Sequence, residues 1–206
     1  GYEFYYPLKS DCEREKSQKK ALLLTHQLSR SGAPLALYLV GEYLQKEGWQ
    51  VIFLSPEDGV LKEDLRKQGF PVILCGKYWN RKIPFQHFGQ LFDIVVVNTL
   101  LHFPAVMLLE ERKCKVVWWI HEMDDFFELG KDDLPLIADL KENVQVLAAG
   151  GFVQNCIEKY LKSKVPVLNV GVEEIHIKRV EPVLKKRFHF ACVGIIAGYK
   201  GQYVLL

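Results

Sequence analysis

The pair His121 and Glu122 follows an apolar run, residues 116–120, that is typical of a buried strand. This strand would deliver His121 to its carboxyl end, where ligands bind in open α/β sheets. An imidazole at that edge can donate a hydrogen bond to a bound hydroxyl or accept one at neutral pH, and Glu122 can orient it. The same residues also fit a solvated acidic loop whose histidine forms local hydrogen bonds. Spacing alone leaves both interpretations open.

A second segment that could bind a ligand follows the first predicted strand. Residues 26–34 lead into a helix, with Ser31 and Gly32 just before Pro34. Gly32 permits close backbone approach, Pro34 suits the first helical turn, and free amides at a helix start can hold a phosphate. A plain strand–helix turn explains the same residues. The Gly-x-Gly-x-x-Gly fingerprint of dinucleotide-binding folds is absent, which counts against a nicotinamide-dependent oxidoreductase.

Other polar residues at strand ends are fewer. Asn98 and Thr99 follow the fourth predicted strand and can either bind a ligand or cap the next helix. A metal site needs several convergent ligands, and His26 is the other histidine at a strand end, so we expect no metal. His87 and His102 are assigned to loops or helix faces.

These residues need a parallel sheet to bring them to one edge. Seven short apolar runs lack the alternation of half-buried strands, as expected for parallel strands covered on both faces. They are residues 21–25, 51–54, 72–74, 94–97, 116–120, 144–147 and 165–168. Pro166 makes the last run an edge or short strand. Amphipathic helices are predicted between the runs, over residues 34–47, 59–68, 104–112 and 152–162. The order predicts a doubly wound, mostly parallel α/β sheet of the Rossmann-like class.

The domain organisation is predicted from the same distribution of apolar and charged residues along the chain. Residues 1–18 are expected to form an N-terminal arm, and residues 19–175 the α/β domain. Residues 176–187, charged and lacking apolar periodicity, are expected to be a linker. Residues 188–206 hold one further buried-strand run and a turn, which we interpret as the start of a truncated second domain.

Composition excludes several classes of protein. With 49% hydrophobic and 25% charged residues, the 206-residue chain is neither disordered nor fibrous. A net charge of +2 is too small for a typical nucleic-acid binder of this size. Five scattered cysteines form no C-x-x-C pair and favour a reducing, cytoplasmic compartment. No apolar stretch is long enough to span a bilayer, although peripheral membrane contact stays open. Oligomeric state is not readable.

Four segments together resemble retaining glycosyltransferases of family four, which share the two-domain GT-B fold. Residues 31–34 resemble that family's first-strand loop, and residues 118–122 its strand ending in His-Asp or His-Glu. Residues 168–173 resemble an Asn-Gly-Val-Asp segment with one extra residue. Residues 190–202 are similar to the strand and Lys-Gly turn that open the C-terminal, donor-binding domain. The resemblance covers roughly residues 20–206.

The resemblance implies roles for these residues. The N-terminal domain would receive the acceptor, and the C-terminal domain a nucleotide-sugar that serves as co-substrate, with no other cofactor. His121 would contact the transferred sugar, and Gly32 would approach the donor. Lys200 would neutralise the diphosphate leaving group without a metal. Ser31, Asn98 and Glu122 complete the expected substrate-binding set.

The expected function is therefore the acceptor-binding half of a retaining, metal-independent glycosyltransferase of polysaccharide biosynthesis, inactive by itself. The acceptor would be a glycan or a lipid-linked glycan. Two departures keep an alternative open: Ile195 stands where many members carry Arg, and the paired-glutamate motif would lie beyond Leu206. The alternative is a non-catalytic sugar- or nucleotide-binding module, or an inactive partner subunit. In a third interpretation, an oxidoreductase, Glu57 or Asp58 would bind a ribose.

Overall fold

A computed structural model of the chain describes residues 1–8, 18–80, 82–123, 140–161, 164–171 and 202–204. The chain divides into two compact units, Gly1–Val172 and Glu173–Leu206. The described part of the second unit is a short 3-10 helix, η4 (Gln202–Val204). The predicted linker and most of the predicted start of a second domain, including Ile195 and Lys200, lie outside the described residues.

The first unit is built on a seven-stranded sheet in the order β1-β4-β3-β2-β5-β6-β7. The strands are β1 (Glu3–Tyr5), β2 (Lys20–Leu24), β3 (Gln50–Ser55), β4 (Val72–Leu74), β5 (Ile94–Asn98), β6 (Val116–Ile120) and β7 (Val144–Ala148). Every pairing is parallel except that of β1 with β4. The six parallel strands match the first six predicted runs to within one residue at each end, which confirms the predicted fold class.

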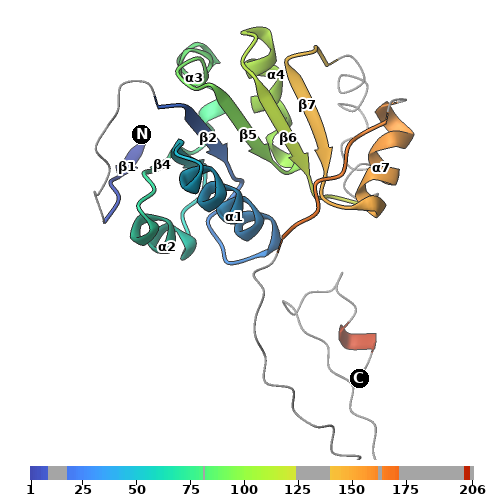
Figure 1. Cartoon of the computed structure of the whole chain (residues 1–206), viewed down its shortest axis with the longest axis horizontal. Helices are drawn as coiled ribbons and strands as arrows, with labels where there is room; N and C mark the ends of the chain where they lie inside the picture. Colours follow the sequence, from blue (N-terminus) through green and yellow to red (C-terminus); the bar gives the residue numbers. More distant parts are fainter. Residues whose placement is uncertain (9–17, 81, 124–139, 162–163, 172–201, 205–206) are drawn as a thin grey trace, which may run out of the picture. The chain divides into compact units, whose positions relative to one another are not determined.

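Helices cover both faces of this sheet (Figure 1). They are α1 (Gly32–Lys46), α2 (Leu61–Gln68), α3 (Lys82–Gly89), α4 (Phe103–Glu111) and α7 (Gly151–Leu161), with short 3-10 turns η1 (Tyr78–Asn80) and η2 (Leu100–His102). Helices α1 and α2 pack on one face, and α3, α4 and α7 contribute to the core on the other. Gly69, in the left-handed conformation, ends α2.

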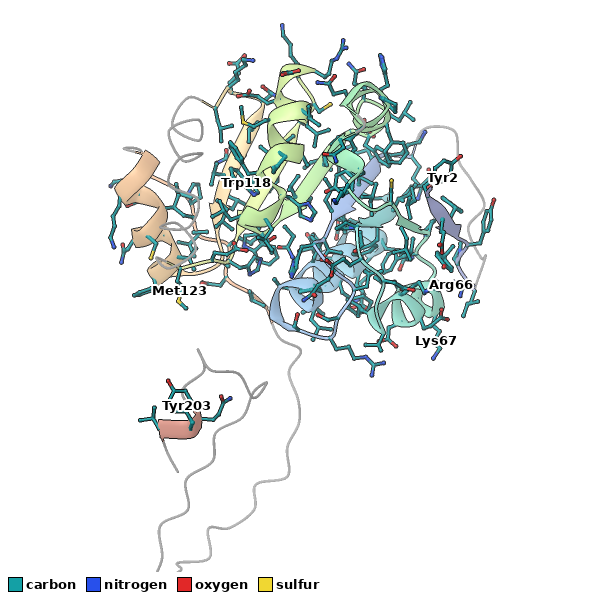
Figure 2. The ribbon with its side chains drawn as sticks, turned by 180° about the vertical axis from the view of Figure 1, so that it is seen from behind. Tyr2, Arg66, Lys67, Trp118, Met123 and Tyr203 are labelled. Atoms are coloured by element: carbon teal, nitrogen blue, oxygen red, sulfur yellow. The ribbon has the colours of Figure 1, made fainter. Side chains whose placement is uncertain are left out.

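The apolar runs show no alternation because both of their faces are buried. In β2, Leu22 and Leu24 join the core beneath α3 and α4, whereas Ala21 and Leu23 join the core beneath α1, and all four are fully buried. Trp118 of β6 is also fully buried and lies in the interior of the domain (Figure 2). Burial of side chains on both faces of a central strand makes the strand ends rigid supports for the residues that follow them.

Two elements were not predicted. Strand β1 arises in the predicted arm, where Lys62 Nζ lies 4.2 Å from the centre of the Tyr5 ring and Arg66 Nε donates to Tyr6 O at 3.0 Å. Antiparallel pairing with β4, together with these contacts with α2, holds this strand. Helix α3 carries Pro84 in its first turn and a short aromatic sequence with weak periodicity. The run at 165–168 contributes an isolated bridge between Val167 and Ala148, as Pro166 suggested.

Two further observations concern the cysteines and the apolar character of the helices. Cys75, Cys114 and Cys156 are buried, as small apolar side chains are. Among the residues that the structure describes, we find no helix long and apolar enough to traverse a bilayer.

Candidate active site at the carboxyl edge of the sheet

The parallel strands bring the predicted polar residues to one edge. Backbone hydrogen bonds continue the ladder past the strand ends. Thr25 N donates to Leu54 O at 3.0 Å, and Thr99 N donates to Trp119 O at 2.9 Å. The residues after β2, β5 and β6 therefore start from fixed positions on three neighbouring strands. This edge lies at the point where the chain's crossovers change direction, between β2 and β5, which is where open α/β sheets bind ligands.

Glu122 ties the ends of β5 and β6 together through the main chain. Its Oε2 accepts hydrogen bonds from Leu100 N at 2.9 Å and from His121 N at 3.1 Å. Burial raises the pKa of its carboxyl group, and these backbone donors partly offset that rise. The sequence suggested that Glu122 orients the imidazole of His121. The contact is instead with the backbone of His121, so Glu122 fixes the loop.

The imidazole of His121 is half-buried beside the ring of Trp119, with ring centroids 4.5 Å apart. Its Nε2 is buried and has no hydrogen-bond partner among the described residues. Burial lowers the pKa of His121 to about 4, and repulsion from His26 adds to this shift. The ring is therefore neutral at pH 7, with one nitrogen that donates and one that accepts.

Asn98, fully buried at the end of β5, joins this strand to α1. Its Nδ2 donates to Ala33 O at 2.8 Å, while its Oδ1 is buried without a partner in the described structure. Asn98 therefore positions the first turn of α1 rather than capping the helix that follows β5. The bond also fixes the amide orientation, because the nitrogen must face the carbonyl.

Thr99 has a strained backbone next to Asn98. Its φ is 76° and its ψ is 157°, a region that favours glycine. The conformation is held by Trp118 Nε1, which donates to Thr99 O at 2.8 Å. The Oγ1 of Thr99 is buried and has no partner in the described part of the chain. Such strain costs on the order of 1–3 kcal/mol and tends to occur at functional sites.

The loop after β2 is held in place by contacts with α2. Leu61 N donates to the O atom of Leu28, which is fully buried, at 2.8 Å, and Arg30 makes two hydrogen bonds of 2.8 and 2.9 Å to Asp64. Ser31 is the N-cap residue of α1, but its side chain does not cap the helix; its Oγ lies 2.7 Å from Ser29 Oγ.

Gly32 is exposed at the start of α1. A Cβ atom built on it would meet no heavy atom within 4 Å. The described part of the chain therefore gives no packing reason for a glycine at this position. Asn98 of β5 holds this loop through Ala33. The predicted site residues that the structure describes therefore lie around neighbouring strand ends; they are Ser31, Gly32, Asn98, His121 and Glu122.

Two further histidines lie at this edge, and the sequence analysis gave neither of them a role in the site. His26 follows Thr25 directly; its Nδ1 is buried without a partner among the described residues, and burial lowers its pKa. His102, which was assigned to a loop or a helix face, is buried in the short helix η2, where its Nδ1 shares a hydrogen bond of 2.6 Å with the hydroxyl of Tyr78. Burial lowers the pKa of His102 to about 4. The available signal was that His26 stands one residue beyond a strand-end threonine.

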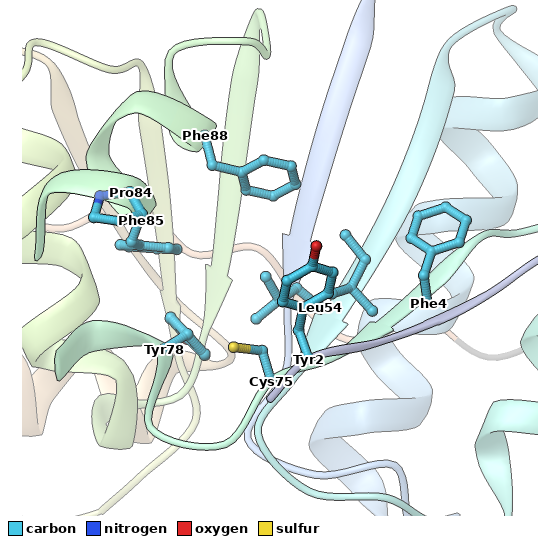
Figure 3. Close-up of a pocket in the computed structure, with 9 residues that line it drawn as sticks. Tyr2, Phe4, Leu54, Cys75, Tyr78, Pro84, Phe85 and Phe88 are labelled. Atoms are coloured by element: carbon cyan, nitrogen blue, oxygen red, sulfur yellow. The ribbon is translucent and has the colours of Figure 1, made fainter. Parts of the chain in front are cut away.

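Two cavities of the described structure lie away from this edge. A cavity of about 390 Å³ has aromatic walls, with Phe85 and Phe88 on the side of α3 and Tyr2 and Phe4 on the side of β1 (Figure 3). A second, of about 880 Å³, lies at the amino edge of β5, β6 and β7. No group of three or more His, Cys, Asp or Glu side chains placed to hold a metal ion occurs among the described residues.

The sheet order and the helices on both faces define a Rossmann-like α/β domain with a polar carboxyl edge. The model of glycosyl-transferase family 4 matches residues 17–176, and the chain belongs to this family. No curated protein matches the chain.

A solved structure with the same fold is that of HepE (Alr3699) from Anabaena, in complex with UDP and glucose. It is 16% identical to this chain with a TM-score of 0.59, and the match covers 76% of this chain and 45% of that one. The chain thus spans less than half the length of this GT-B protein. The likeness confirms the predicted Rossmann-like fold.

Proposed function

We propose that the chain is the acceptor-side part of a retaining, metal-independent glycosyltransferase. The complete enzyme would transfer a sugar from a nucleotide-sugar to a glycan or lipid-linked acceptor. The observation that carries the proposal is the carboxyl edge of a family 4 domain, where buried polar atoms of Asn98, Thr99 and His121 have no partner in the described structure. Buried polar atoms are normally paired, so these atoms favour a ligand that supplies the missing partners.

His121 is assigned to the transferred sugar. Its ring is uncharged at pH 7, because burial lowers its pKa to about 4, and its buried Nε2 is available to a sugar hydroxyl. A neutral imidazole can donate or accept without placing a charge beside the reacting carbon. Trp119 limits the rotation of the ring, and Glu122 fixes the backbone from which it projects.

Ser31 and Gly32 are assigned to the donor. The amides of the first turn of α1 are not capped by Ser31, and open space lies over Gly32. Backbone N–H groups at a helix start stabilise a phosphate through direct hydrogen bonds and the helix dipole. Asn98 holds this turn in place through Ala33.

Lys200, outside the described residues, is assigned to the diphosphate on the basis of the Lys-Gly turn in the sequence. In the transfer, the acceptor oxygen bonds to the anomeric carbon as the bond from that carbon to the diphosphate oxygen breaks. The nucleoside diphosphate leaves with one more negative charge on its terminal phosphate, which a lysine ammonium stabilises. The released proton passes to the departing diphosphate, and no protein nucleophile is assigned.

The test uses the full-length protein encoded with this segment. Transfer from UDP- and GDP-sugars to glycan acceptors is measured for the wild type and for His121→Ala and Lys200→Ala. We expect a loss of kcat/KM of about a hundredfold or more in each variant. A chelator should leave the wild-type rate unchanged.

Unchanged turnover in both variants would contradict the site assignment, and loss of activity with the chelator would contradict metal independence. A wild-type protein that binds a nucleotide-sugar without turnover would favour the alternative, a non-catalytic module.

A further inference from the structure

The carboxyl edge holds one imidazole that the proposed function does not use. His26 follows β2, whereas the assigned residues Asn98 and His121 come from β5 and β6. Strands β2 and β5 are neighbours in register, with Leu24 opposite Val97. The residues that follow, Thr25 and His26, therefore stand beside Asn98 and Thr99. The two imidazoles also lie close enough that a proton on His26 would lower the pKa of His121.

These side chains share an unusual property. Asn98 is fully buried and Thr99 is 2% exposed, yet Asn98 Oδ1 and Thr99 Oγ1 have no partner among the described residues, and the same holds for His26 Nδ1. Three such atoms on two adjacent strand ends are not expected of a packed core, where unpaired polar atoms cost free energy.

We propose that His26, Asn98 and Thr99 form a hydrogen-bonding subsite for the neutral hydroxyl groups of a sugar ring, beside the position assigned to His121. The inference rests on the proposed function, because it names a further contact in the same site. His26 would be a binding residue of the enzyme and not a source of charge.

The hydrogen-bonding character of the atoms indicates a hydroxyl rather than a phosphate. The Nδ2 of Asn98 is committed to Ala33 O, so its Oδ1 can only accept. A phosphate or carboxylate oxygen offers no proton to such an acceptor, whereas a sugar hydroxyl can donate to it and accept from another group at once. Thr99 Oγ1 can do either.

The charge of the subsite agrees with this choice. Burial lowers the pKa of His26, and Glu57 raises it by a smaller amount. A neutral imidazole provides one donor and one acceptor, which again suits vicinal hydroxyls. The sugar can belong to the donor or to the acceptor, since both carry the same chemistry, and kinetics distinguish them.

The first experiment compares one variant of His26 that keeps a polar atom near the position of Nδ1 with one that removes it. Because Nδ1 is the unpartnered atom, His26→Asn keeps a polar atom near its position, and His26→Leu removes it. We expect His26→Leu to raise the KM of one substrate roughly tenfold in the full-length enzyme, with a smaller effect on kcat. His26→Asn should recover most of the lost affinity. His87→Ala, which alters an exposed histidine on α3, serves as the control.

The substrate whose KM changes identifies the source of the sugar. A change for the nucleotide-sugar assigns the transferred sugar to the subsite, and a change for the acceptor assigns the acceptor sugar. Unchanged KM values in His26→Leu overturn the inference. So does an equal effect of Asn and Leu that follows a fall in melting temperature, since that pattern indicates a purely structural role.

The second experiment does not require turnover and so separates this inference from the proposed function. Ring signals of His26 and His87 are recorded by NMR in the full-length protein. The probes are UDP-glucose, UDP-N-acetylglucosamine, GDP-mannose, maltose, and UDP and GDP without sugar. We expect the His26 signal to move with a sugar-bearing probe and not with the nucleotides alone, while His87 stays constant. A His26 signal that does not change with any sugar, or that changes equally with UDP alone, overturns the inference, whether or not the protein transfers sugar.

Discussion

The two edges of the sheet differ in how they treat buried polar groups. At the amino edge, Asn143 Nδ2 donates to Cys114 O at 2.9 Å, and Lys141 N donates to Glu110 Oε1 at 2.7 Å. Among the described residues, one buried atom at this edge, Gln18 Oε1 just before β2, has no partner. At the carboxyl edge there are four such atoms, in His26, Asn98, Thr99 and His121. The larger hollow, about 880 Å³, lies at the amino edge. The unpartnered polar atoms are therefore more numerous at the edge to which we assign ligand binding, whereas the larger of the two cavities lies at the opposite edge.

The largest expected difference is in acid sensitivity. His102, under the carboxyl edge, has a pKa lowered to about 4 by burial, whereas an unfolded chain titrates near the reference value of about 6.5. Between those values the unfolded chain binds a proton that the folded chain does not, so stability falls as the pH drops through this range. From about pH 7 to about pH 4.5, this histidine should account for roughly 2–3 kcal/mol of lost unfolding free energy.

Urea denaturation at both pH values checks this expectation. His102→Gln should remove this part of the pH dependence, and His87→Gln, at an exposed site, should leave it intact. Equal pH dependence of wild type and His102→Gln would contradict the role given to burial.

A matched pair of asparagines tests the two edges directly. Asn98→Ala removes the bond to Ala33 and the free acceptor, so we expect kcat/KM of the full-length enzyme to fall roughly 10- to 100-fold. Asn143→Ala loses its bond to Cys114 and should cost about 1 kcal/mol of stability, with transfer unchanged at a temperature where it stays folded. Similar losses of activity in both variants would remove the functional distinction between the edges.

The smallest expected effect on transfer comes from Gly32, which we compare with a second glycine of α1. Gly32→Ala adds a methyl group to open space, so unfolding free energy should change by less than about 0.5 kcal/mol while transfer falls roughly tenfold. In Gly41→Ala the new Cβ would lie 2.7 Å from Cζ of the buried Phe53, which should cost about 1–3 kcal/mol of stability. Thermal melts and transfer rates measure both. Full activity in Gly32→Ala would show that no ligand approaches this turn.

Sequence was sufficient for the parallel strands because burial on both faces leaves a continuous apolar run, as in β5 and β6. It was insufficient where a distant contact decides the conformation. Strand β1 depends on its pairing with β4 and on contacts with α2, and the positive φ of Thr99 depends on Trp118. The burial of His102 could not be predicted, because its partner, Tyr78, is far away in the sequence.

In the candidate site, too, some features could be predicted from the sequence and others depend on distant contacts. His121 and Asn98 could be found because each directly follows or ends a recognisable strand. Their unpartnered atoms could not, since the commitment of Asn98 Nδ2 to Ala33 depends on how α1 packs across β5. Glu122 was given the right location, but a one-dimensional pattern does not tell whether a carboxylate turns to an imidazole or to a backbone amide.

Trp119 contacts both the last described segment of the first unit and the imidazole of His121. Its Nε1 donates to Leu168 O at 3.1 Å, and its ring lies against His121. Leu168 is a few residues before the end of the first unit at Val172. A shift of this exit segment must therefore stretch the hydrogen bond or turn the indole, and a turned indole presses on the imidazole. We therefore expect the position of the chain at Leu168 and the orientation of the His121 ring to depend on each other through this one side chain.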